Sequence, residues 1–140
     1  MNKTIAVTAL LLFILCGFTC KERQQQKNKI EKVTLRYVDL QIETPLRISC
    51  ENFEDLFSSS YKTVIINDAK QLTKFEDFLS HCEVLDSVKK IDVRVKALIT
   101  YSYKKSSSLC MDKFNNLLLD NKSINANENI VAFIKEHISK

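Results

Sequence analysis

The stretch IDVRVKALITYSY, residues 91–103, alternates apolar and polar side chains over its whole length. Alternation with a period of two is typical of a β-strand that has one buried face and one face in water. The buried face is predicted to hold Val93, Val95, Ala97, Ile99, Tyr101 and Tyr103, and the wet face Asp92, Arg94, Lys96, Thr100 and Ser102, with Leu98 as the exception. This strand therefore predicts an antiparallel sheet with one exposed side.

Shorter alternating or apolar runs lie on both sides of this strand. The apolar phase changes within residues 31–43, and an extra residue in a β-bulge would produce such a change. Pro45 interrupts the pattern before alternation resumes. Lys104–Ser108 is predicted to turn the chain into a hairpin, and Asp120–Ser123 to turn it again. Strands are predicted at residues 31–43, 46–50, 64–66, 91–103, 109–114 and 117–119.

Two capping boxes, Asp68-x-x-Gln71 and Asn125-x-x-Glu128, predict the starts of amphipathic helices. Their apolar stripes are Leu72, Phe75, Leu79 and Cys82, and Ile130, Val131, Ile134 and Ile138. A short helical turn is expected at Phe53–Phe57. The resulting order, β-β-α-β-α-β-β-β-α, predicts one small α+β domain over residues 30–140, with a mainly antiparallel sheet and two to three helices on one face.

Glycine occurs once in the chain, as Gly17. Turn positions with positive φ must then be occupied mainly by Asn or Asp, which tolerate the left-handed region better than other side chains. The predicted positions are Asn67-Asp68, Asn115-Asn116 and Asp120-Asn121.

Residues 1–19 read as a signal peptide, because Lys3 precedes a nearly continuous apolar run from Ile5 to Phe18 that is too short to span a membrane. An uncleaved anchor or a buried helix is the alternative. Cys20 and the nine polar residues KERQQQKNK form a predicted tether over residues 20–29, which spans roughly 15–18 Å as a flexible coil.

Gly17-Phe18-Thr19-Cys20 resembles the lipobox of bacterial lipoproteins, and ordinary cleavage after Thr19 is the alternative. With the tether and the glycine-poor domain, the layout resembles the small lipoproteins of Bacteroidota-type bacteria. The resemblance implies a diacylglycerol and acyl chains such as palmitate on Cys20. It also implies a cell-envelope location, at the outer membrane on its periplasmic or surface side, and it implies no activity.

Three of the five cysteines remain if Cys16 is removed and Cys20 carries a lipid. An oxidising compartment favours one disulfide among Cys50, Cys82 and Cys110, and three pairings are possible. Cys50 and Cys110 each end a predicted strand, which favours that pair, whereas three free buried thiols are the alternative. Their spacing matches no zinc motif, so no metal site is expected.

No catalytic residue and no cofactor are predicted. His81 and Cys82 are neighbours on a predicted helix, so their side chains diverge, and Asp39 and Glu43 lie too far apart along a strand to act as a carboxylate pair. Asp92 and Asp112 are expected to be solvated strand charges. An enzyme of unrecognised type remains a third alternative.

The basic clusters are Lys89-Lys90 and Lys104-Lys105 in a chain of net charge +4. Lys104 and Lys105 are expected at a hairpin tip beside two tyrosines, where they could contact anionic lipid or a partner, or only keep the turn soluble. Both clusters are short, so no nucleic acid partner is predicted.

The predicted function is a non-enzymatic envelope lipoprotein that binds a protein or a small ligand through the exposed sheet face or through the Lys104–Ser108 turn. The alternative is an inhibitor or immunity-type lipoprotein that neutralises a secreted enzyme or toxin.

Overall fold

The computed structural model describes residues 29–87, 89–125 and 127–139. The predicted signal peptide, residues 1–19, lies outside the described residues. So do Cys20 and the rest of the tether up to residue 28.

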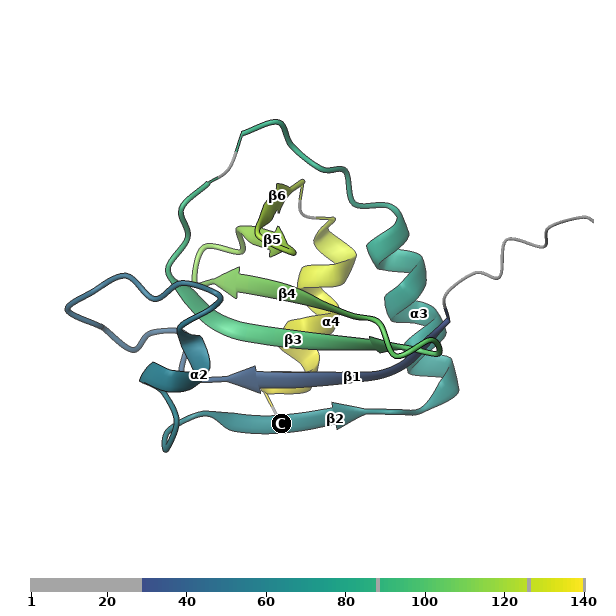
Figure 1. The fold of residues 1–140 in the computed structure, drawn as a ribbon, viewed down its shortest axis with the longest axis horizontal. Helices are drawn as coiled ribbons and strands as arrows, with labels where there is room; N and C mark the ends of the chain where they lie inside the picture. Colours follow the sequence, from purple (N-terminus) through teal and green to yellow (C-terminus); the bar gives the residue numbers. More distant parts are fainter. Residues whose placement is uncertain (1–28, 88, 126, 140) are drawn as a thin grey trace, which may run out of the picture.

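The described residues form a six-stranded antiparallel sheet and three helices, which confirms the predicted α+β domain. The strand order β2-β1-β3-β4-β5-β6 makes β3 and β4 central and β2 and β6 the edges (Figure 1). The strands are β1 (Ile30–Tyr37), β2 (Lys62–Ile66), β3 (Val93–Tyr101), β4 (Ser106–Asp112), β5 (Leu117–Leu119) and β6 (Lys122–Ile124). The helices are α2 (Phe53–Leu56), α3 (Ala69–Ser80) and α4 (Glu128–Ile138).

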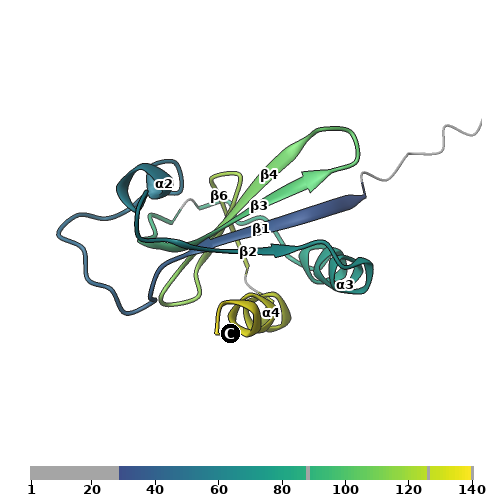
Figure 2. The ribbon, with the colours of Figure 1, turned by 90° about the horizontal axis from the view of Figure 1, so that it is seen from below.

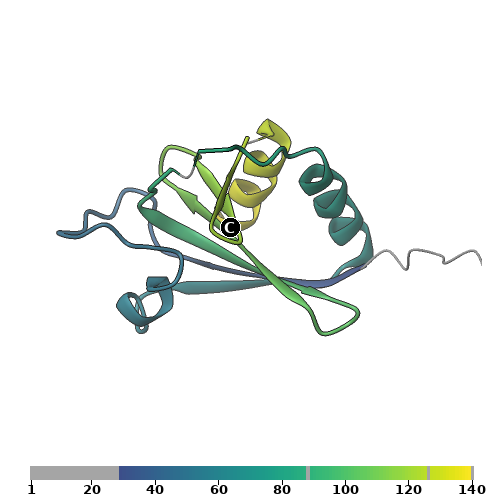
Figure 3. The ribbon, with the colours of Figure 1, turned by 45° about the horizontal axis from the view of Figure 1, so that its top comes forward.

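The helices lie on both sides of the sheet. Helices α3 and α4 cover one face side by side, as Figures 2 and 3 show, which meets the expectation of two to three helices on one face. The short helix α2 lies on the opposite face (Figure 2). The face that the sequence predicts to be wet is therefore partly covered.

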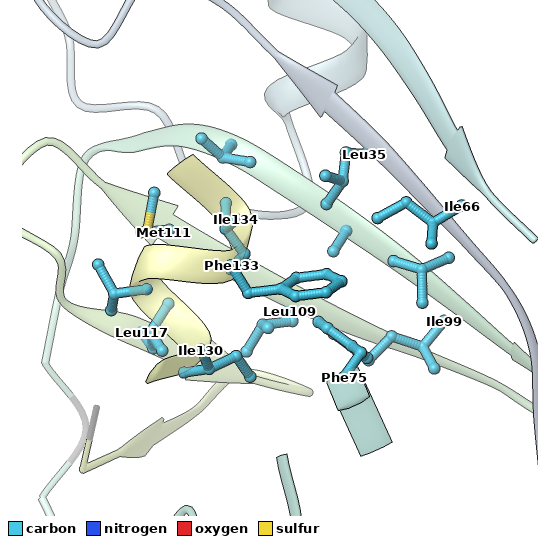
Figure 4. Packing of buried hydrophobic residues seen from close by; sticks show 14 of the residues in the cluster. Leu35, Ile66, Phe75, Ile99, Leu109, Met111, Leu117, Ile130, Phe133 and Ile134 are labelled. Atoms are coloured by element: carbon cyan, nitrogen blue, oxygen red, sulfur yellow. The ribbon is translucent and has the colours of Figure 1, made fainter. Parts of the chain in front are cut away.

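The first hydrophobic core lies between the sheet and the helices α3 and α4 (Figure 4). Phe75 of α3 and Phe133 of α4 are buried with ring centroids 5.5 Å apart. They pack with aliphatic side chains that the strands direct to this face, among them Leu35, Ile66, Ile99, Leu109 and Leu117.

A second core lies on the other face, and a β-bulge at Arg94 adds Val93 to it. Val93 pairs with Asp112 and Val95 with Met111, so one residue of β3 has no partner on β4. The extra residue moves Val93 to the opposite face from Val95, and the prediction that they share a face is wrong. The second core comprises Val38, Ile48, Cys50, Phe53, Phe57, Ile91, Val93, Cys110 and Leu118.

The predicted strand over residues 31–43 is too long, because β1 ends at Tyr37, and the register irregularity of β1 against β3 lies at its start, between Ile30 and Lys32, not at the predicted phase change. The predicted strand over residues 46–50 is wrong, since this stretch is a loop. Ile48 still bonds to the start of β3: its carbonyl accepts from the Val93 N–H at 2.9 Å, and its N–H donates to Asp92 at 2.8 Å. These single contacts replace a continuous ladder.

The turn chemistry is partly as predicted. Positive φ is confirmed at Asn115, Asp120 and Asn121, and the last two close the β5–β6 hairpin, whose second strand the sequence analysis missed. Lys104, with φ 56°, was not expected, and Asn67-Asp68 has no positive φ.

The first predicted helix start is confirmed, because the Asp68 side chain accepts from the Gln71 N–H. The second is displaced. Asn127, not Asn125, caps α4, and its side chain accepts from the Asn129 N–H.

Candidate functional site

Two features lie at opposite ends of strand β1. At its start, the Ser102 N–H donates to the Lys29 carbonyl at 3.0 Å, so the beginning of the described chain lies beside the β3–β4 turn, here called the hairpin tip (residues 102–105). At its end, the chain leaves the sheet in a projecting loop (residues 39–47), here called the distal loop (left in Figure 1). The eight residues of β1 separate the two features by roughly 26 Å at about 3.3 Å per residue.

The distal loop displays apolar side chains to solvent. Leu46 is 74% exposed, and Ile42 is 37% exposed. Pro45, beside Leu46, is exposed as well and restricts the backbone at this point. An apolar side chain held in water has a free-energy gain available when a partner covers it.

Arg94 fixes the base of the distal loop. This arginine is only 2% exposed, although the alternating pattern predicts it on the wet face. Its Nε donates to the Ile42 carbonyl at 3.1 Å, and its Nη2 donates to the Thr44 hydroxyl at 3.2 Å. The bulge that carries Arg94 therefore connects β3 to the loop.

Asp92 balances the charge of the buried guanidinium. Its two carboxylate oxygens accept from Arg94 Nη1 and Nη2 at 2.8 and 2.7 Å. Burial alone raises the pKa of Asp92, but the hydrogen bonds from Arg94 and from the Ile48 N–H, with the charges of Arg94 and Lys113, outweigh burial and hold the pKa below its usual value. Asp92 is thus ionised at neutral pH, and it is ion-paired with Arg94 although its side chain stays 39% exposed.

Asp112 is not a solvated strand charge, since it is 4% exposed. Its carboxylate accepts from the Phe114 and Asn116 N–H groups at 2.9 Å each. Asp112 therefore closes the β4–β5 turn.

A disulfide joins Cys50, just beyond the distal loop, to Cys110 in β4, with Cα atoms 5.9 Å apart. Of the pairings that the sequence left open, the structure contains this one, and Cys82 is a free, half-buried thiol. The disulfide lies in the second core with Phe53 and Phe57. The disulfide therefore fixes the chain just after the distal loop, whereas Arg94 contacts residues within the loop.

Helix α2 is attached to the sheet by charges. Glu54 accepts from Lys96 Nζ at 2.8 Å and also pairs with Arg36. Burial, followed by the nearby charge of Arg36, lowers the pKa of Lys96. Glu54 thus bridges β1 and β3 on the face opposite α3 and α4.

A hollow of about 610 Å³ lies between the start of the distal loop, the start of β2 and the end of α4. Its walls include the apolar groups of Tyr37, Val38, Leu40 and Ile138, with Asp39 and Lys62 as charged members. The hollow can accept a small apolar group or a side chain of a partner.

The hairpin tip carries the predicted contact residues Lys104 and Lys105, both exposed. Tyr103 between the sheet and these lysines is 48% exposed, and Tyr101 is half-buried. The tip is thus an exposed basic turn with an aromatic ring beside it.

His81 and Cys82 lie just after α3, which ends at Ser80, so the prediction that both lie on this helix is wrong, and they form separate local contacts. His81 Nδ1 lies 2.7 Å from the Asp77 carbonyl, and Cys82 donates to the Phe78 carbonyl. Among the described side chains, no three of His, Cys, Asp and Glu are grouped in a way that could hold a metal ion. The expectations of no catalytic residue and no cofactor stay predictions.

Comparison of the chain with protein-family models, curated proteins and solved structures gave no match. None of the helices in the described part of the chain is long and apolar enough to cross a membrane. Function must therefore be inferred from the two ends of β1 and from the predicted signal peptide.

Replacing Arg94 with methionine is expected to destabilise the protein by about 3 kcal/mol, at the low end for a broken buried ion pair because Asp92 remains partly hydrated. The pKa of Asp92 is expected to rise, since its largest favourable contacts disappear. In the wild type, the stabilisation from this pair is present above the ordinary pKa of an aspartate and is lost as pH falls through the lowered folded-state value. Urea unfolding at neutral and acidic pH, with a carbon NMR titration of Asp92, measures both effects.

The matched control is Arg47→Met, because Arg47 is an exposed arginine of the same loop. Its effect on stability is expected to stay within about 0.5 kcal/mol. Equal losses in the two variants would contradict the role assigned to Arg94.

Proposed function

We propose that this chain is a non-enzymatic binding protein of the bacterial cell envelope, anchored by a lipid on Cys20, which binds a protein partner through its distal loop. The observation that carries the proposal is Leu46, 74% exposed on a loop whose base is fixed by the buried Arg94. An exposed apolar side chain on a fixed loop is suited to bind a partner's pocket.

Fixing the loop before binding reduces the entropy that association costs. Arg94 bonds to Ile42 and Thr44, and the disulfide at Cys50 fixes the chain that follows. A few residues near the centre of an interface commonly carry most of its binding energy. Leu46, with Pro45 beside it, is the candidate anchor.

The position of the loop suits an anchored protein. The tether would reach the domain at Lys29, and the distal loop lies at the other end of β1. A lipid on Cys20 would therefore leave the loop at the end of the domain that is remote from the membrane.

The second candidate function is inhibition of a secreted enzyme or toxin, as an inhibitor or immunity-type lipoprotein. The projecting shape of the distal loop favours it, because a loop fixed at its base can enter a concave site of another protein. Both functions use Leu46, and they differ in what binding does to the partner.

Cross-linking and affinity capture from the cell envelope test the proposal. The wild type is expected to retain a partner. Leu46→Asp is expected to bind this partner at least tenfold more weakly, and tenfold in affinity equals about 1.4 kcal/mol. The matched control is Val84→Asp, which places the same charge at a different exposed apolar residue. Val84 is 60% exposed. Inhibition of the captured partner's activity by the wild-type chain would select the second function.

Equal capture by Leu46→Asp and the wild type would exclude the distal loop as the contact. A wild-type protein that retains no partner would contradict protein binding altogether.

A further inference from the structure

Basic side chains gather at the end of the sheet where the described chain begins. Lys104 and Lys105 are exposed at the hairpin tip, and Lys29 is held beside them by the bond from the Ser102 N–H to its carbonyl. Lys32 is exposed on β1 opposite Thr100, near the end of β3. Glu31 on β1 and Asp68, two residues beyond the end of β2, are exposed carboxylates at the same end, so the four lysines leave an excess of positive charge there.

The conformation of the tip indicates that lysine is there for its side chain. Lys104 has a left-handed backbone, with φ 56°, which costs a residue other than glycine about 1–2 kcal/mol. The other described residues with positive φ are Asn115, Asp120 and Asn121, the types that tolerate this region best. Strain accepted for one particular side chain is more common at functional positions than elsewhere.

The turn holds its shape through its own backbone. The Lys104 N–H donates to the Tyr101 carbonyl at 3.1 Å, and the Tyr101 N–H donates to the Lys105 carbonyl at 3.0 Å. The two lysines are thus presented from a fixed turn with the half-exposed ring of Tyr103 beside them. Lysine and an interfacial tyrosine together suit the headgroup region of an anionic membrane.

The proposed anchor would bring the tip close to such a surface. Residues 21–29 span roughly 15–18 Å as a coil, and the tether itself contains Lys21, Arg23 and Lys27. A short tether makes docking nearly intramolecular, so weak contacts become effective.

From these observations we infer that the hairpin tip, with Lys29 and Lys32, docks on anionic phospholipid headgroups. Docking orients the domain so that the distal loop points away from the bilayer. The inference rests on the proposed function for the anchor, but the contact itself needs no lipid on the protein.

The test uses the mature chain from residue 20 with Cys20→Ser, which carries every described element and both cores but cannot be acylated. It is sedimented with vesicles of phosphatidylglycerol and phosphatidylethanolamine, or of phosphatidylcholine alone. Binding is expected to the anionic vesicles only and to weaken as salt is added. Lys104→Glu/Lys105→Glu is expected to reduce partitioning by at least about 30-fold, since each lysine near the surface contributes about 1 kcal/mol.

The matched control is Lys89→Glu/Lys90→Glu, which changes the net charge equally at two exposed lysines outside the tip. It is expected to keep most of the binding, and circular dichroism checks that both variants are folded. Equal loss in the two variants would overturn the inference by showing that only net charge matters. Absence of wild-type binding to anionic vesicles would also overturn the inference. So would a wild-type protein that binds an acidic peptide but does not bind the anionic vesicles.

The intact mass of the protein recovered from bacterial membranes tests the anchor separately. An unmodified Cys20 would contradict the proposed function and leave the vesicle result standing. An acylated Cys20 without tip-dependent binding would contradict the docking alone.

Discussion

Replacing Phe133 with alanine is expected to lower the free energy of unfolding by about 3–5 kcal/mol. Phe133 is 2% exposed, and its ring centroid lies 5.5 Å from that of Phe75, 6.3 Å from that of Phe78 and 4.3 Å from that of His137. Truncation would leave a cavity where α3, α4 and the sheet meet. Urea unfolding followed by circular dichroism measures the loss. The dependence of the free energy of unfolding on urea concentration is expected to stay unchanged.

The matched control is Phe114→Ala, which removes the same side chain at a position that is 72% exposed. Its effect is expected to stay within about 0.5 kcal/mol, because little apolar surface is buried there. Similar losses at Phe114 and Phe133 would contradict the described first core.

Removal of the disulfide in the double variant Cys50→Ala/Cys110→Ala is expected to cost about 4 kcal/mol. The bridge spans a sequence separation of 60 residues, and closing so long a loop strongly restricts the unfolded chain. Amide hydrogen exchange in the distal loop is expected to quicken as well, because the chain beyond the loop loses its covalent link to β4. Chemical unfolding and exchange measured by mass spectrometry test the two effects.

Cys82→Ala serves as the control, since this cysteine is free and only half-buried. It is expected to change stability by no more than about 1 kcal/mol. A wild-type protein whose stability does not fall under reducing conditions would argue against the structural role of the bridge.

The sequence predicts much of the fold because most of its patterns are local. The alternation in residues 91–103 corresponds to β3, and the stripes through Phe75 and Ile134 correspond to α3 and α4. The bulge at Arg94 could not be predicted, because it depends on the register in which β3 pairs with β4. One unpaired residue there moves Val93 into the second core.

The loop after β1 shows why alternation alone is insufficient. Leu46 and Ile48 alternate with polar residues as a strand would, yet Leu46 is in solvent and Ile48 is in the second core. Arg94, Thr44 and the Ile42 carbonyl hold this segment away from a sheet partner. No local pattern specifies contacts between residues that are about fifty positions apart.

Parts of the candidate site were accessible to sequence reasoning. The hairpin turn that carries Lys104 and Lys105 follows from the pattern, but it lies earlier than the predicted Lys104–Ser108, because β3 ends at Tyr101 and β4 begins at Ser106. Arg94 was missed because an arginine in an alternating strand is normally in water. Its position two residues after Asp92 is only a weak signal, because side chains two apart on a strand share a face whether or not they form an ion pair.

The strand order has a consequence for a polypeptide that crosses a membrane before it folds. Strand β1 is made early but lies between β2 and β3, and the first core lacks Phe133 until α4 has emerged. Contacts between segments so distant in the chain form late and slowly. If the proposed signal peptide directs export, the first core of a partly translocated chain stays incomplete until α4 has crossed the membrane.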